Sequence, residues 1–246
     1  MIVENGEWMM VGVDADDPSC VHSVEELIDL IDRVGFIPLF GGGSIPGFSV
    51  EEHTVPDHWF TGDSENDPWE WRMIVTRRRR AAYGKFFGNK AGFVSLSCLP
   101  DFVNARREGY DFDARWDDEK ASMREKKIMD LFADGNEGAE LYSPEIKKRA
   151  GFGKGGEKGF EGTLAKLQMQ FYLCPIDFRQ RINKSGDAFG WSIAVFSTPE
   201  HIWGRELVTS AYGKDPKESA RSIAEKLRDN YPDITEREMR RIIGTI

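Results

Sequence analysis

Apolar side chains recur every three to four residues in several stretches of the chain, which is the spacing of one face of an α-helix. The clearest case predicts a helix over residues 24–34, with apolar positions Val24, Leu27, Ile28, Ile31 and Val34. Ser23 and Glu26 form a capping box at its start, and Gly35 is typical of a left-handed helix end. The same signals predict further helices over residues 99–107, 118–133, 217–231 and 235–243.

The patterns that predict strands cover shorter stretches than those that predict helices. Two apolar runs, residues 83–87 and 90–95, flank Gly88-Asn89 and predict a β-hairpin. A further strand is predicted around residues 8–13. Residues 36–67 are predicted to be irregular because glycine and proline are frequent there, and so long a loop is typically functional or disordered.

The longest run of connected signals covers residues 141–204. Ser143-Pro144 predicts the start of a short helix, a glycine-rich turn follows at residues 151–156, and apolar spacing predicts a second helix over residues 157–170. A hairpin and a third helix start are then predicted at residues 171–181, 189–197 and Thr198-Pro199. Helix, turn, helix and hairpin in this order are typical of a winged helix-turn-helix, whose second helix enters the major groove of DNA.

Charge is sorted along the chain. The formal net charge is −9, but residues 1–71 hold sixteen acidic residues and one basic residue, Arg33. Residues 72–90 hold seven basic residues and no acidic one, and residues 141–181 hold eight basic against four acidic. Because phosphate binding depends on local positive faces, this distribution favours a DNA partner despite the negative total. The alternative is that the basic segments are solvated faces that balance the acidic segment.

Aromatic residues gather at the end of the irregular segment. Trp69 and Trp71 have the spacing of two residues on one face of a strand. Together with His58 and Trp59 they predict an aromatic-walled pocket able to stack a base or another flat ligand. The alternative is that these rings form the core of the domain.

Several other classes of protein find little support. No apolar run approaches the roughly 20 residues that a membrane helix needs, so we expect no membrane partner and a cytoplasmic location. The three cysteines lie far apart and no histidine pair has helical metal-site spacing, so we expect no metal and no cofactor. Residues 151–156 match G-x-G-x-x-G but follow a helix, which suits a single phosphate better than a dinucleotide.

Several segments together resemble the AlkZ-related bacterial proteins, a group named for its similarity to the AlkZ-like winged-helix DNA glycosylases. The resemblance is carried by residues 143–159 and by the segments Leu167-Gln168-Met169-Gln170, Asp67-Pro68-Trp69-Glu70-Trp71, Tyr83-Gly84-Lys85-Phe86-Phe87 and Lys90-Ala91-Gly92-Phe93. It implies winged helices that embrace duplex DNA and excise alkylated bases through a Gln-aliphatic-Gln motif. Gln168 and Gln170 match that motif and are the implied catalytic residues. The alternative is that both are simple polar positions or DNA contacts.

A glutamine cannot take a proton as a carboxylate does, so such a mechanism rests on positioning a water and on a cationic leaving base. The expected contacts to double-stranded DNA come from the recognition helix, the wing and the arginine run. These are Lys154, Lys158, Lys166, Gln170, Arg179, Arg181, Lys184, Arg77, Arg78, Arg79 and Arg80.

The sequence therefore predicts an α+β fold in which a winged helix-turn-helix module packs with an N-terminal α+β region. The expected domains are residues 1–135 and 139–246, with a linker at residues 135–138. The expected function is DNA binding, with glycosylase activity on alkylated bases. Two alternatives stay open: a transcriptional regulator without chemistry, and a small-molecule binder that uses the tryptophan-rich loop.

Overall fold

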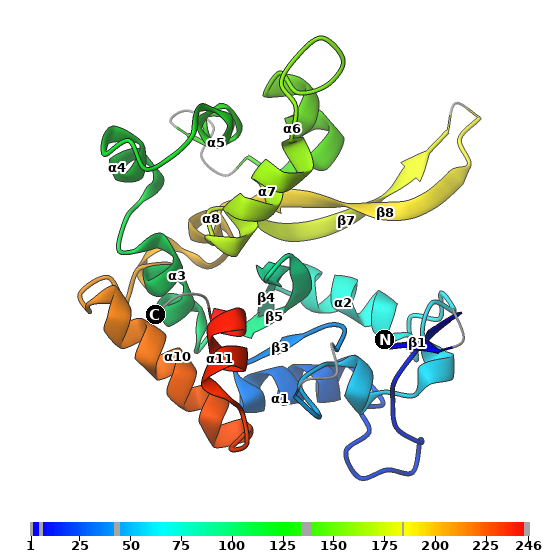
Figure 1. Cartoon of the computed structure of the whole chain (residues 1–246). Coiled ribbons are helices and arrows are strands. Elements are labelled where there is room, and N and C mark those ends of the chain that lie inside the picture. The colour runs from blue at the N-terminus through cyan, green and yellow to red at the C-terminus, as the bar shows by residue number, and fades with distance from the viewer. Residues whose placement is uncertain (1, 5–6, 42–44, 134–138, 184, 244–246) are drawn as a thin grey trace.

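The computed structural model describes residues 2–4, 7–41, 45–133, 139–183 and 185–243. Its strands form three small antiparallel sheets (Figure 1). The sheets are β1 (Ile2–Glu4) with β2 (Glu7–Met9); β3 (Phe36–Pro38), β5 (Lys90–Ser95) and β4 (Ala81–Phe87), in the order β3-β5-β4; and β6 (Leu141–Tyr142), β8 (Ala188–Ser197) and β7 (Cys174–Ile182), in the order β6-β8-β7. With the helices around them, these sheets confirm the α+β class.

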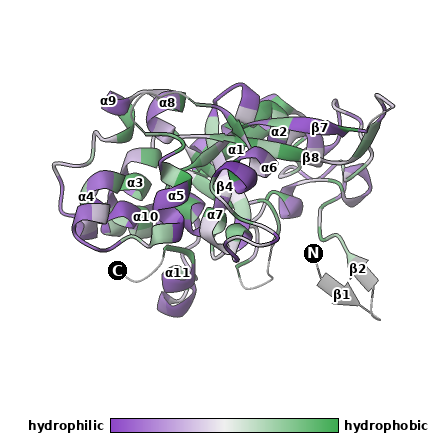
Figure 2. Ribbon diagram, turned by 90° about the horizontal axis from the view of Figure 1, so that it is seen from above, coloured by the Kyte–Doolittle hydropathy of each residue, from purple (hydrophilic) through white to green (hydrophobic). Residues whose placement is uncertain are grey.

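The helices mostly surround the strands, with hydrophilic residues on outer helices such as α10 and α11 (Figure 2). Their bounds are α1 (Val24–Val34), α2 (Pro68–Arg77), α3 (Leu99–Arg107), α4 (Phe112–Asp117), α5 (Met123–Met129), α6 (Ser143–Arg149), α7 (Phe160–Met169), α8 (Pro199–Trp203), α9 (Arg205–Val208), α10 (Pro216–Asn230) and α11 (Glu236–Ile243). Two 3₁₀ turns, Glu51–His53 and Pro56–His58, lie in the segment predicted to be irregular, which also contains β3.

Capping residues explain the elements that were predicted well. The Ser23 side chain accepts from the Glu26 N–H, and the Gly35 N–H donates to the Ile31 carbonyl from a left-handed conformation. Gly88 and Asn89 both have positive φ angles, as the tight turn of the predicted hairpin between β4 and β5 requires.

The tryptophan pair was predicted wrongly as part of a strand. Asp67 caps α2 by accepting from the Trp69 N–H at 2.8 Å, and Pro68 occupies the first helical position. Two residues along a helix differ in direction by about 200°, so Trp69 and Trp71 point to different sides. The Asp67-Pro68 dipeptide was the sequence signal for a helix start at this position.

Three other boundaries also differ from the prediction. The helix predicted over residues 118–133 is shortened to α5 (Met123–Met129), because Glu119 adopts a positive φ and Ser122 with Glu125 forms the capping box that starts the helix. Left-handed Gly159 delays the start of α7 to Phe160. The strand predicted around residues 8–13 ends at Met9, the last residue of β2.

Residues from both predicted domains share one buried cluster. Phe36 and Phe86 of the first half lie in it with Phe171, Val195 and Ile242 of the second half. The predicted linker, residues 135–138, lies outside the described residues, which stop at 133 and resume at 139. The division into residues 1–135 and 139–246 stays a prediction.

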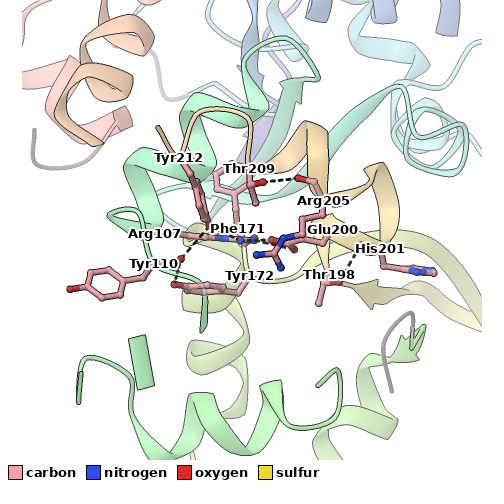
Figure 3. A network of polar contacts seen from close by, with 10 residues as sticks. All are labelled: Arg107, Tyr110, Phe171, Tyr172, Thr198, Glu200, His201, Arg205, Thr209 and Tyr212. Carbon is pink, nitrogen blue, oxygen red and sulfur yellow. Dashed lines mark hydrogen bonds and ion pairs between the residues drawn. The ribbon is translucent and has the colours of Figure 1, made fainter. Parts of the chain in front are cut away.

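Arg107 connects the two halves through a buried polar network (Figure 3). Its side chain is 2% exposed, pairs with Glu200 at 2.5 Å and donates to the Phe171 carbonyl at 2.5 Å and to the Tyr212 hydroxyl at 3.1 Å. Burial lowers the pKa of Arg107, but the neighbouring Glu200 carboxylate outweighs burial and raises this pKa above its usual value. The guanidinium therefore holds the turn after α7 against α3 and α8.

Replacing Arg107 with methionine leaves Glu200 and the Phe171 carbonyl without their partner. We expect Arg107→Met to lower the free energy of unfolding by about 3–5 kcal/mol, as for other broken buried ion pairs. Urea denaturation followed by circular dichroism measures this change. The exposed Arg221→Met is the control, with an expected change of under about 0.5 kcal/mol. Equal stabilities of the two variants would contradict this role.

Candidate functional site

A cavity of about 510 Å³ lies among α2, β4, α7 and the hairpin β7–β8. Figure 1 shows the hairpin running alongside α2, with α7 near the base of the hairpin. The cavity has the volume of typical small-ligand pockets, which range over roughly 300–1,000 Å³. Its lining is mainly aromatic and aliphatic, with four polar side chains of particular interest: Arg72, Lys85, Glu161 and Gln168.

Aromatic rings from three separate segments form one side of the cavity. Trp191 of β8 meets Trp69 of α2 edge-to-face at a centroid distance of 5.5 Å, and it meets Phe60 at 5.8 Å. Trp191 is 64% exposed and Phe60 is 43% exposed, so both rings present apolar surface to solvent at the rim. Exposed rings around a concave site favour a flat ligand that stacks on them.

Arg72 is the buried charge of the cavity wall. The residue is only 3% exposed. Its guanidinium carbon lies 3.5 Å from the centroid of the Trp69 ring and 4.6 Å from the centroid of the Phe178 ring. Its Nε and Nη1 atoms are buried and have no hydrogen-bond partner among the described residues. Burial lowers the pKa of Arg72, an effect that nearby Tyr83 partly opposes. Arginine nevertheless stays protonated in proteins, so a positive charge remains here without a paired carboxylate.

Gln168 lines the same cavity from α7 and is 4% exposed. Its Oε1 accepts from the Lys85 N–H of β4 at 3.2 Å, and its Nε2 donates to the Leu164 carbonyl at 3.3 Å. A Cβ at Gly84 would lie 2.8 Å from the Phe86 ring, so glycine there lets that ring pack against β4, and the same Cβ would lie at an ordinary contact distance of 3.4 Å from Gln168 Oε1. The amide is therefore held in one orientation beside the cavity.

Glu161 precedes Gln168 by two helical turns and lines the cavity as well, as does Leu164 between them. The Glu161 carboxylate is largely exposed and lies 3.5 Å from the Lys147 ammonium of α6. One face of α7 thus presents a carboxylate, an apolar side chain and an amide to the same cavity.

Gln170 points away from Gln168. In the amide orientation that satisfies its neighbours, Gln170 donates to Glu125 Oε1 at 3.2 Å and accepts from Arg115 Nη2 at 3.1 Å. Burial raises the pKa of Glu125, but its hydrogen bonds with Ser122 and Lys166 lower this pKa further than burial raises it. The two glutamines of the predicted pair therefore face different surroundings.

The four residues predicted to form one pocket lie in different places in the structure. Of them, only Trp69 lines this cavity. Trp59 is buried and donates to the Thr54 hydroxyl at 2.9 Å, while Trp71 is buried and donates to the Glu65 carbonyl at 3.1 Å. His58 is half-buried in the second 3₁₀ turn. Trp59 and Trp71 therefore pack in the core of the protein, which was the alternative to a pocket role.

The arginine run is largely paired within the chain. Arg77 contacts Asp177 at 2.5 Å and donates to the Phe178 carbonyl at 2.7 Å, which joins α2 to β7. Arg78 pairs with Glu25 at 2.6 Å, and Arg80 lies 3.9 Å from Asp32. Arg79 is exposed and makes no ion pair with the described residues.

The other predicted DNA contacts lie around the second helix and the hairpin. Lys154 and Lys158 are exposed in the loop before α7, whereas Lys166 pairs with buried Glu125 at 3.0 Å. Arg179 lies 4.0 Å from Asp177, and Arg181 is exposed on β7. Lys184 lies outside the described residues.

Phe40, Phe60, Arg72 and Trp191 line the cavity but were not predicted as site residues. The exposed position of Trp191 between Gly190 and Ser192 on a hairpin strand was a usable signal, because a large ring there has no core to enter. The buried charge of Arg72 had no sequence signal, since its neighbours come from distant segments.

Two negative findings apply to the described residues. They contain no cluster of histidine, cysteine and carboxylate side chains suited to hold a metal ion. None of their helices is long and apolar enough to cross a membrane.

The fold and the cavity define an α+β protein with an aromatic-lined cavity among α2, β4, α7 and the hairpin β7–β8. The chain belongs to the AlkZ-related family, whose model matches residues 21–244 and confirms the expected resemblance. No curated protein matches the chain. It is similar to the structure of Streptomyces sahachiroi DNA glycosylase AlkZ, with a TM-score of 0.43 and 12% identity over 91% of this chain. The chain spans 59% of the length of that structure.

Removing the unpaired charge of the cavity wall should stabilise the protein. We expect Arg72→Met to raise the free energy of unfolding by about 1–3 kcal/mol, because methionine packs between Trp69 and Phe178 without an unmet donor. Urea denaturation measures the change. The matched comparison is Arg107→Met, which replaces a buried arginine that has hydrogen-bond partners. A loss of stability as large as that of Arg107→Met would show that Arg72 is a structural residue.

Proposed function

We propose that the chain binds duplex DNA through residues 141–204 and receives one extruded base in the cavity. The observation that carries this proposal is a base-sized cavity with aromatic rings at its rim and the fixed amide of Gln168 in its wall. Enzymes that act on a base inside a duplex extrude it and read it by stacking and hydrogen bonding. Membership of the AlkZ-related family supports a role related to DNA repair.

The element order also supports DNA binding. Helix α5 is followed by β6, α6, α7, β7 and β8, and the strand order is β6-β8-β7. A winged helix combines this succession with a recognition helix and a hairpin wing. In the proposal, α7 is the recognition element and β7–β8 is the wing.

The proposed DNA contacts are predicted basic residues that are exposed and make no ion pair with the described residues. Lys154 and Lys158 lie in the loop that leads into α7, Arg181 lies on the wing and Arg79 follows α2. Phosphates are contacted by such free cations, while cations already paired with carboxylates contribute less. Arg77, Arg78 and Arg80 are proposed to hold α2 in place, because they pair with Asp177, Glu25 and Asp32.

The proposed reaction is hydrolysis of the N-glycosidic bond. A water oriented by Gln168 loses a proton to the Glu161 carboxylate while its oxygen bonds to the sugar C1′. The C1′–N bond breaks, the base leaves with that electron pair and takes up a proton from solvent, and Glu161 returns its proton to solvent. Glu161 supplies the proton acceptor that a glutamine pair lacks. Gln170 is a positioning residue, because it contacts Glu125 and Arg115 between α4, α5 and α7.

A second candidate function is binding of a small flat anion. The unpaired Arg72 between two aromatic rings favours it, since a carboxylate or phosphate satisfies a buried guanidinium. Quenching of tryptophan fluorescence by such metabolites, without any effect of DNA, would support this function instead.

Binding to duplex DNA should be salt-dependent and should require the loop before α7. We expect the double variant Lys154→Ala/Lys158→Ala to reduce the slope of log affinity against log salt by about 2, close to one unit for each lost phosphate contact. Fluorescence anisotropy between 50 and 200 mM salt measures the slope, and the chain without substitutions should lose affinity steeply over this range. The control is Lys217→Ala, an exposed lysine on α10. Slopes that match for the variant and the parent would contradict the proposed contacts.

Base release should depend on α7. On duplexes that each carry one damaged base, we expect Gln168→Ala and Glu161→Gln to slow release by about 10²–10⁴-fold while DNA affinity stays within a few-fold. Strand cleavage with alkali after incubation measures the abasic product. Glu145→Gln, a carboxylate paired with Arg149 on α6, is the matched control. Parent-like rates for both α7 variants would exclude the proposed chemistry.

A further inference from the structure

We infer that Arg72 makes the cavity select a neutral base bearing hydrogen-bond acceptors over a cationic alkylated base. This inference rests on the proposed function, because it assumes that an extruded base occupies the cavity. It names the chemical class of that base. The residue that carries it, Arg72, has so far no assigned role in the proposed reaction.

The first support is an unmet need for acceptors. Arg72 is 3% exposed, and its Nε and Nη1 atoms find no partner among the described residues. The nearby Asp67 carboxylate accepts instead from the backbone N–H groups of Phe60, Gly62 and Trp69. A buried donor without a partner is costly, so an acceptor brought by a ligand gains more here than at a solvated arginine.

The second support is the sign of the charges. The charged side chains of the cavity wall are Arg72, Lys85 and Glu161. Glu161 lies near the Lys147 ammonium, which reduces its field, whereas Arg72 and Lys85 make no ion pair within the described residues. A cationic base would therefore lie beside two cations and one carboxylate that is partly neutralised by Lys147, and the buried charge of Arg72 would repel it most strongly.

The third support is the chemistry of purines. Arginine recognises guanine through the O6 and N7 acceptors. Alkylation at N7 consumes the N7 lone pair and makes the base cationic, so it removes one acceptor and adds a repulsive charge. A deaminated purine such as hypoxanthine stays neutral and keeps both O6 and N7. The ring faces of either base stack equally well on Trp69 and Trp191.

The test compares four duplexes of identical sequence by fluorescence anisotropy with the full chain. They carry hypoxanthine, 7-deazahypoxanthine, 2′-fluoro-stabilised 7-methylguanine or no damage at the central position. We expect the hypoxanthine duplex to bind roughly tenfold more tightly than the other damaged duplexes, the scale of one hydrogen bond to a charged donor. Arg72→Gln should abolish that difference, and Arg221→Gln, at an exposed arginine of α10 outside the proposed DNA contacts, should preserve it.

The possible failures are distinguishable. Tighter binding of the 7-methylguanine duplex, or an Arg72→Gln variant with the parent's preference, overturns the inference and leaves the proposed function intact. Equal affinity for all four duplexes also overturns it, while DNA binding stands. If no duplex binds at micromolar protein, the proposed function itself fails. Circular dichroism of Arg72→Gln confirms that the variant is folded.

Discussion

The hydrogen bond from Arg107 to the Phe171 carbonyl, just after α7, is the interaction on which the geometry of the cavity depends. The Phe171 carbonyl that Arg107 holds belongs to a left-handed residue directly after the helix, and the Phe171 ring stacks on Phe86 of β4 at 4.2 Å. Since Phe171 lies three residues after Gln168, this contact sets the register between α7 and β4. The hydrogen bond between Gln168 and the Lys85 N–H is therefore a consequence of packing that begins outside the cavity.

The hairpin β7–β8 is fixed by a second set of contacts at the other side of the cavity. Arg77 connects α2 to Asp177 and to the Phe178 carbonyl, so the hairpin lies against the N-terminal half of the chain. This attachment places Trp191 beside Trp69, although the two residues are far apart in sequence. A hairpin that is free in solution would not form this aromatic wall. Within the proposed function, the wing therefore helps to form the pocket besides any contact with phosphates.

Local signals in the sequence were sufficient for most helices and for both long hairpins. Capping residues such as Ser23 and Thr198, and the Gly88-Asn89 turn, act within a few positions of the element that they limit. The cavity was only partly predictable from the sequence. Gln168 and Trp69 were predicted as site residues and line the cavity, but Phe40, Phe60, Arg72 and Trp191 line it as well and were not predicted. Their proximity arises from pairing between distant segments, which no short pattern encodes.

The two buried arginines show how similar sequence contexts lead to different physical roles. Each sits on a helix among aromatic residues, yet Arg107 meets a carboxylate, a carbonyl and a hydroxyl and leaves only its Nε without an acceptor, while Nε and Nη1 of Arg72 both meet none among the described residues. Helix α2 would pack equally well with an apolar side chain between Trp69 and Phe178. A charge kept there at a cost in stability is typical of functional sites, where the missing partner arrives with the ligand. Within the proposed function, the ligand supplies acceptors for the Arg72 nitrogens that have none among the described residues.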